Sequence, residues 1–343
     1  MTYSIEALSG DNVHLWNEFN LQSREGTPFH STQWKNIVED VLKLKLRYYL
    51  IFEDERIIGI FPFVEDSIRH FRGLNGVPSS EFNNVLLDDS FDTSRINDVL
   101  SLFSKEHSFL YLYTYNPALL DRIEYDSVPN DDGGNVILNL NQKNPEMIWN
   151  DILSKDERYK ISRFEKGGFE VREIDQGRDF ERFYHYYAEN LHHIKGRVLP
   201  FPFFQRLLDA FSPNIKIFIV TKEDAFAGGN LAILDPIRKI AYFQYLAINR
   251  DLPNKYSPSY YLSWDGINWA WNNGYERISF GRENRDNPRV RNKLKFGAEY
   301  VPIHSRAVLL SKTISLLYRL KKTLFENDAK QTSSAGRVSQ WQD

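Results

Sequence analysis

The pattern of apolar and polar positions occurs twice along the chain. The first copy opens with a β-type run at Tyr3 to Leu8, passes through two helical patterns, and reaches two β-rich runs, Leu46 to Phe52 and Arg56 to Val64, around an acidic turn. Between Phe169 and Leu234 the order is the same: a strand, two helices, and two strands around a second acidic turn. We therefore predict a tandem duplication with weak identity between the copies.

The most organised stretch of the second copy is Tyr242 to Glu299. An apolar run from Tyr242 to Ile248 predicts a strand, and Ile278 to Gly281 predicts another. Between them lies an amphipathic helix, with Ser257 as its N-cap and Gly274 just past its end. The three elements form a predicted βαβ unit, whose loop opens at the carboxyl end of the first strand, where α/β sheets bind ligands.

The helix predicted after Ser257 has two distinct faces. Its larger apolar side chains recur at helical spacing, and beside them runs a face of small side chains that permits close packing on a sheet. The first face comprises Tyr260, Trp264, Ile267 and Trp271, and the second comprises Ser263, Gly266 and Ala270. Most of these side chains are expected in the core. The amino-terminal end of the helix is a candidate site for phosphate or carboxylate, because its free N–H groups and positive dipole end favour anions.

The remaining patterns complete an α/β (α+β) plan with two similar domains, each a mixed, largely antiparallel sheet flanked by helices. One long helix is predicted over Pro145 to Lys166, a turn over Asn130 to Gly134, and a cleft-lining loop over Phe71 to Asn84. The predicted divisions are a first domain over 1–150, a second over 151–310, a carboxyl-terminal helix over 311–326 and a disordered tail over 327–343.

Composition excludes several kinds of site. The chain has 343 residues, a net charge of −3 and no cysteine, so disulfides, thiol catalysis, zinc–thiolate sites and a global positive field for nucleic acid are excluded. His192 and His193 diverge at a helix end and no HExxH spacing occurs, so we expect no metal. No apolar run approaches the roughly 18 to 20 residues of a membrane span, and Met1 to Gly10 lacks the form of a signal peptide. A soluble, cytoplasmic protein is expected.

Basic residues concentrate directly after the second strand of the βαβ unit. Six of them, against two acidic residues, are Arg282, Arg285, Arg289, Arg291, Lys293 and Lys295. Such a segment suits a phosphate-bearing acceptor, either a nucleotide sugar or lipid pyrophosphate, or the acceptor stem of a tRNA. For Arg289 and Lys293 a solvated helix face is the alternative. Lys160 and Arg163 likewise lie either on an exposed face or in a groove between the halves that meets an anionic substrate.

Several short motifs, through their order and spacing, resemble one family. In the second half they are His193-Ile194-Lys195-Gly196 with Pro200 and Phe203-Phe204, Gly274-Tyr275 before Ile278-Ser279-Phe280-Gly281-Arg282, and Lys293 before Phe296-Gly297-Ala298-Glu299. In the first half they are Pro28-Phe29-His30 with Gln33-Trp34, and Ile57-Ile58-Gly59-Ile60-Phe61-Pro62. Together they resemble the FemAB-like, tandem-GNAT family of aminoacyl and acyl transferases, relatives of the peptidoglycan-bridge aminoacyltransferases. The resemblance covers roughly Tyr3 to Ser305 and implies tandem GNAT-like domains.

The resemblance implies acyl transfer to an amine, or less often to a hydroxyl. Such a step needs a group that removes a proton and donors that stabilise an oxyanion. Glu283 follows the second strand directly and is the candidate base, with pairing to Arg282 or Arg285 as its structural alternative; Tyr245 is the second catalytic candidate. The candidate substrate-binding residues are Lys195, Arg197, Tyr260, Arg282, Arg285 and Lys293, and the candidate acyl-donor or phosphate ligands are Arg250, Lys255 and Ser259.

The donor is left open between aminoacyl-tRNA and acyl-CoA. CoA-dependent GNAT enzymes place glycines before the long helix so that backbone N–H groups reach the pyrophosphate, whereas Arg250 to Lys255 contains no glycine and includes Pro253. We expect a transferase that acts on a cell-envelope or polysaccharide precursor, such as a nucleotide sugar or lipid-linked molecule. The alternatives are a catalytically silent tandem GNAT that binds a nucleotide-linked glycan or RNA, and an acyl-CoA-dependent N-acetyltransferase of a small amine.

Overall fold

The structure, a computed structural model, describes residues 2–82, 85–174, 176–253 and 256–321. Its strands are β1 (Tyr3–Ala7), β2 (Leu46–Glu53), β3 (Arg56–Ile68), β4 (Phe71–Asn75), β5 (Leu86–Leu87), β6 (Phe109–Thr114), β7 (Ser127–Asn139), β8 (Glu170–Ile174), β9 (Ile215–Lys222), β10 (Ala225–Asp235), β11 (Ile240–Ile248), β12 (Arg277–Glu283) and β13 (Glu299–Leu309). Its α-helices are α1 (Val13–Gln22), α2 (Thr32–Leu42), α3 (Ile96–Phe103), α4 (Pro117–Asp121), α5 (Pro145–Met147), α6 (Lys155–Lys166), α7 (Arg178–His193), α8 (Phe201–Phe211), α9 (Pro258–Asn272) and α10 (Pro288–Leu294). Shorter or wider turns are η1 (Pro28–His30), η2 (Thr93–Arg95) and η3 (Ile148–Ile152), and residues 312–321 are helical.

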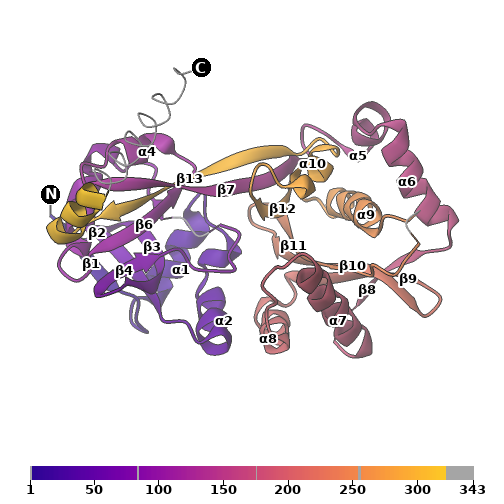
Figure 1. The fold of residues 1–343 in the computed structure, drawn as a ribbon, viewed down its shortest axis with the longest axis horizontal. Helices are drawn as coiled ribbons and strands as arrows, with labels where there is room; N and C mark the ends of the chain where they lie inside the picture. Colours follow the sequence, from indigo (N-terminus) through magenta and orange to yellow (C-terminus); the bar gives the residue numbers. More distant parts are fainter. Residues whose placement is uncertain (1, 83–84, 175, 254–255, 322–343) are drawn as a thin grey trace, which may run out of the picture.

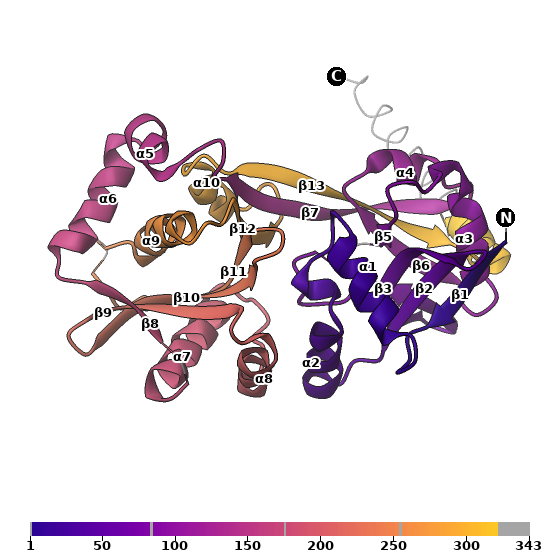
Figure 2. The ribbon, with the colours of Figure 1, turned by 180° about the vertical axis from the view of Figure 1, so that it is seen from behind.

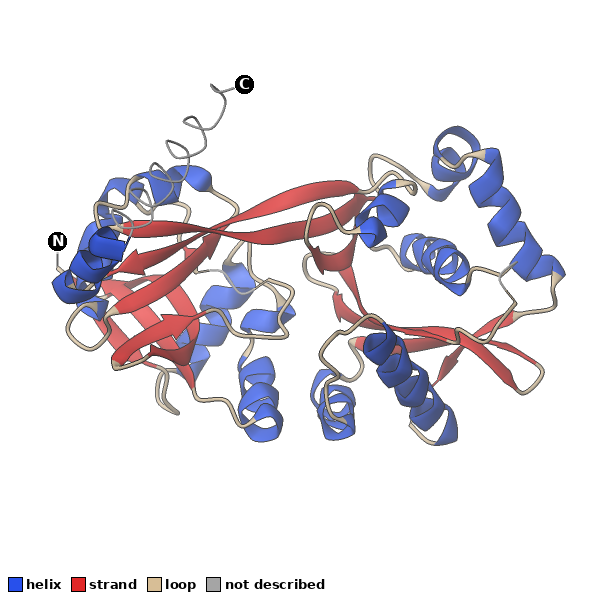
Figure 3. Cartoon of the chain, in the orientation of Figure 1, coloured by secondary structure: helices blue, strands red, loops and turns tan. Residues whose placement is uncertain are grey.

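The chain forms two lobes joined by the long strands β7 and β13 (Figure 1). The amino-terminal lobe contains β1 to β6 with α1 to α4, and the carboxyl-terminal lobe contains β8 to β12 with α6 to α10 (Figure 2). One sheet runs through both lobes in the order β1-β2-β3-β4-β6-β13-β7-β12-β11-β10-β9-β8, with β5 beside β3. In the carboxyl-terminal lobe, α7 and α8 lie on one face of the sheet and α9 on the other (Figure 3). The predicted fold class is confirmed.

The two lobes exchange strands. β7 follows the amino-terminal lobe in sequence, yet it pairs antiparallel with β12 of the carboxyl-terminal lobe. β13 ends the carboxyl-terminal lobe in sequence, yet it pairs antiparallel with β6 of the amino-terminal lobe. β7 and β13 also pair with each other from Glu299 opposite Ile137 to Val308 opposite Ser127. Each lobe therefore completes its sheet with a strand from the other.

The turn predicted over Asn130 to Gly134 is wrong, because these residues lie inside β7. The register against β13 shifts between Pro302 and His304, so the turn-forming sequence accommodates an irregularity in a continuous strand. Gly133 has a φ of +82°, and a Cβ added there would lie 2.4 Å from the Glu283 carbonyl oxygen. Glycine is thus required by backbone geometry and close approach rather than by a chain reversal.

The single long helix predicted over Pro145 to Lys166 is also wrong. After α5 and η3, Leu153 adopts an extended conformation with a ψ of 128°, and the chain then starts α6. Ser154 caps α6 by accepting from the Glu157 N–H at 3.3 Å, while the Glu157 carboxylate accepts from the Ser154 N–H at 3.1 Å. This capping box was present in the sequence as a helix-start signal and overrides the continuous apolar pattern.

The predicted βαβ unit is confirmed as β11, α9 and β12, with β11 and β12 parallel. A Cβ on Gly266 would lie 2.4 Å from the Phe243 ring, so the small-residue face of α9 does pack closely on the sheet. Trp271, predicted on the apolar face, is instead 42% exposed. The Ser257 side chain makes no capping hydrogen bond within the part of the chain that is described, although Ser257 does occupy the N-cap position.

Three other predictions concern segment limits. The loop predicted over Phe71 to Asn84 begins with a strand, β4, and residues 76–82 form a loop; residues 83–84 lie outside the described residues. The helix predicted over 311–326 is present at 312–321, and the tail predicted over 327–343 lies outside the described residues. The domain division near residue 150 stays a prediction.

An apolar core continues from one lobe to the other. Phe29 of the amino-terminal lobe meets Tyr242 of β11 edge-on at 5.3 Å between ring centres, and Trp34 of α2 meets Phe203 of α8 at 5.8 Å. All four side chains are buried and belong to one cluster. Edge-to-face aromatic pairs add about 0.5 to 1.5 kcal/mol beyond the burial of their area. The lobes are therefore packed against each other as well as being linked through the sheet.

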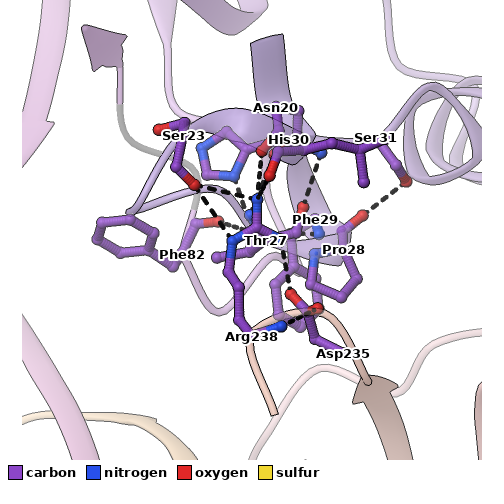
Figure 4. Close-up of polar contacts among 11 residues, drawn as sticks. Asn20, Ser23, Thr27, Pro28, Phe29, His30, Ser31, Phe82, Asp235 and Arg238 are labelled. Carbon is purple, nitrogen blue, oxygen red and sulfur yellow. Dashed lines mark hydrogen bonds and ion pairs between the residues drawn. The ribbon is translucent and has the colours of Figure 1, made fainter. Parts of the chain in front are cut away.

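Arg238 makes the main polar contact between the lobes (Figure 4). It lies in the turn between β10 and β11, and its guanidinium donates to backbone carbonyls at the end of α1, including Leu21 at 3.1 Å and Ser23 at 3.1 Å. The same guanidinium pairs with Asp235 at 2.8 Å, and the two side chains are only 10% and 5% exposed. The last carbonyls of a helix lack intrahelical partners and carry partial negative charge, so a buried cation satisfies both needs.

We predict that Arg238→Ala lowers the free energy of unfolding by about 3 kcal/mol or more, because it leaves the buried Asp235 carboxylate unpaired and the α1 carbonyls unsatisfied. The matched control is Lys239→Ala, the next residue, whose ion pair with Glu276 is solvent-exposed and worth about 1 kcal/mol at most. Urea unfolding measures both. Equal effects of the two substitutions would contradict a structural role for Arg238.

Candidate active site

The sheet opens into a notch between β11 and β12. These parallel strands pair only from Ile240 to Tyr242 and from Arg277 to Ser279, although both continue beyond these residues. Opposite β10, residue Gln244 of β11 is skipped in the register, which marks a β-bulge where the strand turns away. The backbone of β11 beyond Tyr242 therefore has no paired strand on its β12 side among the described residues. An extended ligand can add to such an edge by main-chain hydrogen bonds.

A cavity of about 620 Å³ continues from this notch to the interface between the lobes. Its floor comes from β11 and β12, and its walls come from α7, α9 and α10. The amino-terminal lobe contributes Ser79, Ser80 and Glu81, from the loop after β4. A second hollow of about 460 Å³ adjoins it and shares Arg282, Glu283 and Arg289. The sequence prediction that the loop after Gly76 lines a cleft is therefore consistent with the structure.

Most of the predicted site residues line the cavity. They are Glu283, Tyr245, Arg197, Tyr260, Arg282, Lys293, Arg250 and Ser259. Two others do not. Lys195 is exposed in a left-handed conformation after α7, and the Arg285 guanidinium lies over the Tyr300 ring at 5.9 Å. Lys255 lies outside the described residues.

Glu283 is held in a polar network rather than poised as a base. Its carboxylate accepts from Asn287 Nδ2 at 3.0 Å and pairs with Arg289 at 3.2 Å and Lys293 at 3.3 Å. Lys293 also donates to the Phe280 carbonyl in β12. Burial lowers the pKa of the Lys293 ammonium, while the charge of Glu283 opposes that shift. Glu283 therefore forms ion pairs with Arg289 and Lys293 of α10, and its catalytic role stays a prediction.

Two groups at the other end of the cavity favour anions. Arg250, just beyond β11, donates to Asn190 Oδ1 from Nε at 3.1 Å and from Nη2 at 2.7 Å, which fixes the guanidinium beside the cavity. The amino-terminal end of α9 brings Ser259 and Tyr260 to the same wall. Tyr260 is itself held by its hydroxyl, which donates to Asn292 at 3.1 Å. These contacts fix a cation and the start of α9 beside one part of the cavity.

Known proteins share this architecture. A family model described as "Acetyltransferase (GNAT) domain" matches residues 154–287, from the start of α6 to the end of β12. The crystal structure of FemX has a TM-score of 0.67 and 11% identity, with 92% of this chain and 99% of FemX covered. A tandem GNAT protein from the clavulanic acid biosynthesis pathway has a TM-score of 0.59 and 8% identity, covering 90% and 99%. L-PGS from Bacillus licheniformis has a TM-score of 0.57 and 13% identity, covering 91% and 96%.

The chain has the fold of FemX and of a tandem GNAT protein, and its residues 154–287 match the GNAT acetyltransferase domain. The resemblance predicted from short motifs is confirmed, and so is the enzyme class, N-acyltransferase of the GNAT superfamily. No curated protein matches the chain in sequence. None of the helices in the described ranges is long and apolar enough to cross a membrane.

Residues that line the notch include buried polar atoms that have no partner in the described part of the chain. The Tyr245 hydroxyl and Gln244 Oε1 have no hydrogen-bond partner within the described part of the chain. Burial raises the pKa of Tyr245 well above its usual range, so its hydroxyl stays protonated and able to donate. Buried groups without partners cost about 1 to 3 kcal/mol each, so their presence in a cavity indicates a ligand that supplies the partners.

Glu81 is the functional candidate that sequence reasoning missed. Its Oε1 accepts from the Ser279 hydroxyl and from Asn135 Nδ2 at 3.3 Å, whereas Oε2 has no partner in the described ranges. The side chain is 1% exposed, and burial raises its pKa to about 8, with the Lys293 charge acting in the opposite direction. The sequence marked its loop as cleft-lining, but only the approach of two lobes brings Glu81 to β12.

We predict that Glu81→Gln changes the pH dependence of stability. Unfolded, a glutamate has a pKa near 4.3, so between about pH 5 and pH 8 the folded protein holds a proton that the unfolded chain has lost. The stability of the natural protein therefore falls as pH rises through this window, by about 1.4 kcal/mol per pH unit from this group, and levels off above it. Glutamine does not titrate and escapes this loss.

Thermal unfolding from pH 5 to pH 9 measures the effect. The variant should be close to the natural protein at pH 5 and clearly more stable than it at pH 8. Glu55→Gln, in the exposed turn between β2 and β3, controls for the removal of one carboxylate. A stability difference that stays constant with pH would show that Glu81 titrates in the folded protein as it does in the unfolded chain.

Proposed function

We propose that this protein transfers an acyl group from a thioester donor of the acyl-CoA type to an amine of a phosphate-bearing cell-envelope or polysaccharide precursor. The observation that supports it most is the notch between β11 and β12, which opens onto a cavity with cationic groups at both ends. A donor laid along β11 places its acyl carbon near the start of the notch, and the acceptor then approaches from the interface between the lobes.

The donor end of the proposed site is the wall formed by Arg250 and the start of α9. The glycine-free sequence before α9 lacks the usual flexible cradle for a pyrophosphate, but Arg250 is fixed by Asn190 and supplies a positive charge there. Gln244 and Tyr245 supply unsatisfied polar groups along the strand, which suit the amides and carbonyl of an acyl-pantetheine chain. The cavity therefore fits an acyl-CoA donor.

The acceptor end is the adjoining hollow. Arg282 lies over the Tyr113 ring at 5.4 Å and lines both the cavity and the hollow, as does Arg289. Guanidinium groups bind phosphate oxygens in a bidentate manner, so this mouth suits the phosphate of a nucleotide sugar or lipid-linked precursor.

We predict that acetyl-CoA stabilises the protein, by about 2.7 kcal/mol at 100 times its Kd. Arg250→Ala should weaken donor binding by about tenfold, equivalent to about 1.4 kcal/mol, through the loss of one charge-assisted contact. The control is Arg206→Ala, on the exposed face of α8. Thermal shift and calorimetric titration measure both variants. Stabilisation by aminoacyl-tRNA without any response to acetyl-CoA would replace the proposed donor.

For the acceptor, we predict that UDP-N-acetylglucosamine stabilises the natural protein and that Arg282→Ala weakens this response at least tenfold, while the response to acetyl-CoA persists. Arg285→Ala is the matched control, because Arg285 belongs to the same basic segment but lies over Tyr300 outside the cavity lining. Equal losses in the two variants would indicate a diffuse electrostatic effect and remove Arg282 from the acceptor site.

A further inference from the structure

We propose that Glu81, supplied by the amino-terminal lobe, is the general base that accepts the proton of the attacking amine in the carboxyl-terminal lobe. This inference rests on the proposed acyl transfer and names a residue of that reaction. It assigns to the amino-terminal lobe a direct part in the chemistry, although the matched GNAT domain begins only at residue 154.

The Glu81 carboxylate lies where β11 and β12 separate. Ser279, which donates to Glu81 Oε1, is the last residue of β12 that pairs with β11 before the strands separate. Asn135 of β7 donates to the same oxygen at 3.3 Å. Two contacts therefore fix one carboxylate oxygen at the apex of the notch, and Oε2 of this cavity-lining residue is buried without a partner in the described ranges.

Few of the described residues that line the cavity could act as a base. Among the described residues that line it, Glu81 and Glu283 are the two that carry carboxylates. Both carboxylate oxygens of Glu283 already have partners within the site, namely Asn287, Arg289 and Lys293. Glu81 has no such commitment at Oε2. The residue expected from the sequence to be the base thus anchors α10 to β12, and the base comes from the other lobe.

The surroundings of Glu81 alter the pKa of its carboxylate. Burial raises the pKa of Glu81 to about 8, which lies near the working pH of a general base. The charged and titratable groups that act on it are Lys293 of α10, Tyr242 and Tyr245 of β11, and Tyr115 after β6. Burial holds these tyrosines neutral by raising their pKa values, so Lys293 is the cation that stabilises the ionised carboxylate.

The loop that carries Glu81 is fixed in place by the amino-terminal lobe. Phe82 stacks on Tyr115 at 4.2 Å between ring centres, and the Ser80 hydroxyl accepts from the Trp34 indole at 2.7 Å. In this lobe the parallel pair of β4 and β6 is also short, covering Gly73 and Leu74 opposite Phe109 and Leu110. The chain that leaves β4 runs into the cavity of the other lobe, where it presents the base.

In the proposed step, the amine nitrogen attacks the acyl carbon, a C–N bond forms, and the amine proton passes to Glu81 Oε2. The C–S bond then breaks and the sulfur leaves as a thiolate, which the protonated Tyr245 hydroxyl can stabilise by a hydrogen bond. Glu81 releases its proton to solvent and the thiolate takes one up, so the products are an amide and a free thiol.

The test combines donor binding with turnover. Glu81→Gln is compared with Glu25→Gln, an exposed carboxylate of the same lobe that lines a different hollow. Acetyl-CoA affinity is measured by calorimetry, and free-thiol release is followed from pH 6 to pH 9 with a panel of primary amines and with water alone as the acceptor. Ser279→Ala is a third variant, because it removes a hydrogen bond that favours the ionised form of the base.

We expect Glu81→Gln to bind acetyl-CoA within twofold of the natural protein, to lose at least 100-fold in kcat and to lose the ascending limb of the pH profile. Glu25→Gln should keep both. Ser279→Ala should shift the limb to higher pH. Turnover of Glu81→Gln within threefold of the natural rate, or acetyl-CoA binding without thiol release above buffer in the natural protein, would overturn the role of Glu81. Failure of the natural protein to bind acetyl-CoA would instead overturn the proposed function, and this inference with it.

Discussion

The exchange of β7 and β13 between the lobes is the constraint on which the rest of the structure depends. Because β7 completes the carboxyl-terminal sheet and β13 completes the amino-terminal one, neither sheet reaches its full width alone. The hydrogen bonds between β7 and β12 therefore also hold the amino-terminal lobe beside the notch, because β7 pairs with β13 and β13 pairs with β6. The buried contacts of Phe29 with Tyr242 and of Arg238 with α1 add side-chain packing to this backbone link.

Such a link explains how a loop of one lobe becomes part of the cavity of the other. A catalytic group must be held within a fraction of an ångström, and two lobes joined by a flexible linker do not provide this. Here Asn135, on the exchanged strand itself, donates to Glu81. The strand β7, which joins the lobes, thus also positions the Glu81 carboxylate through Asn135.

The sequence was most informative where a local rule decides the structure. The β-rich runs that form β2 and β3, and the βαβ unit around α9, follow from patterns of neighbouring residues. The turn predicted at Gly133 failed because glycine there meets the Glu283 backbone, a contact made by a distant strand. Glu81 escaped notice for the same reason, and the ion pairs of Glu283 with Arg289 and Lys293 of α10 could not be read from the strand that carries Glu283.

Several residues that line the cavity have buried polar atoms without hydrogen-bond partners among the described residues. Glu81 Oε2, the Tyr245 hydroxyl and Gln244 Oε1 are buried without partners among the described residues, while the aromatic core beneath them is closely packed. An apolar replacement at any of the three would remove a desolvation cost, so their presence opposes stability. Glu81, Gln244 and Tyr245 all line the cavity beside the unpaired edge of β11. A ligand that supplied partners to these atoms would recover part of the desolvation cost, so its binding would stabilise the folded protein.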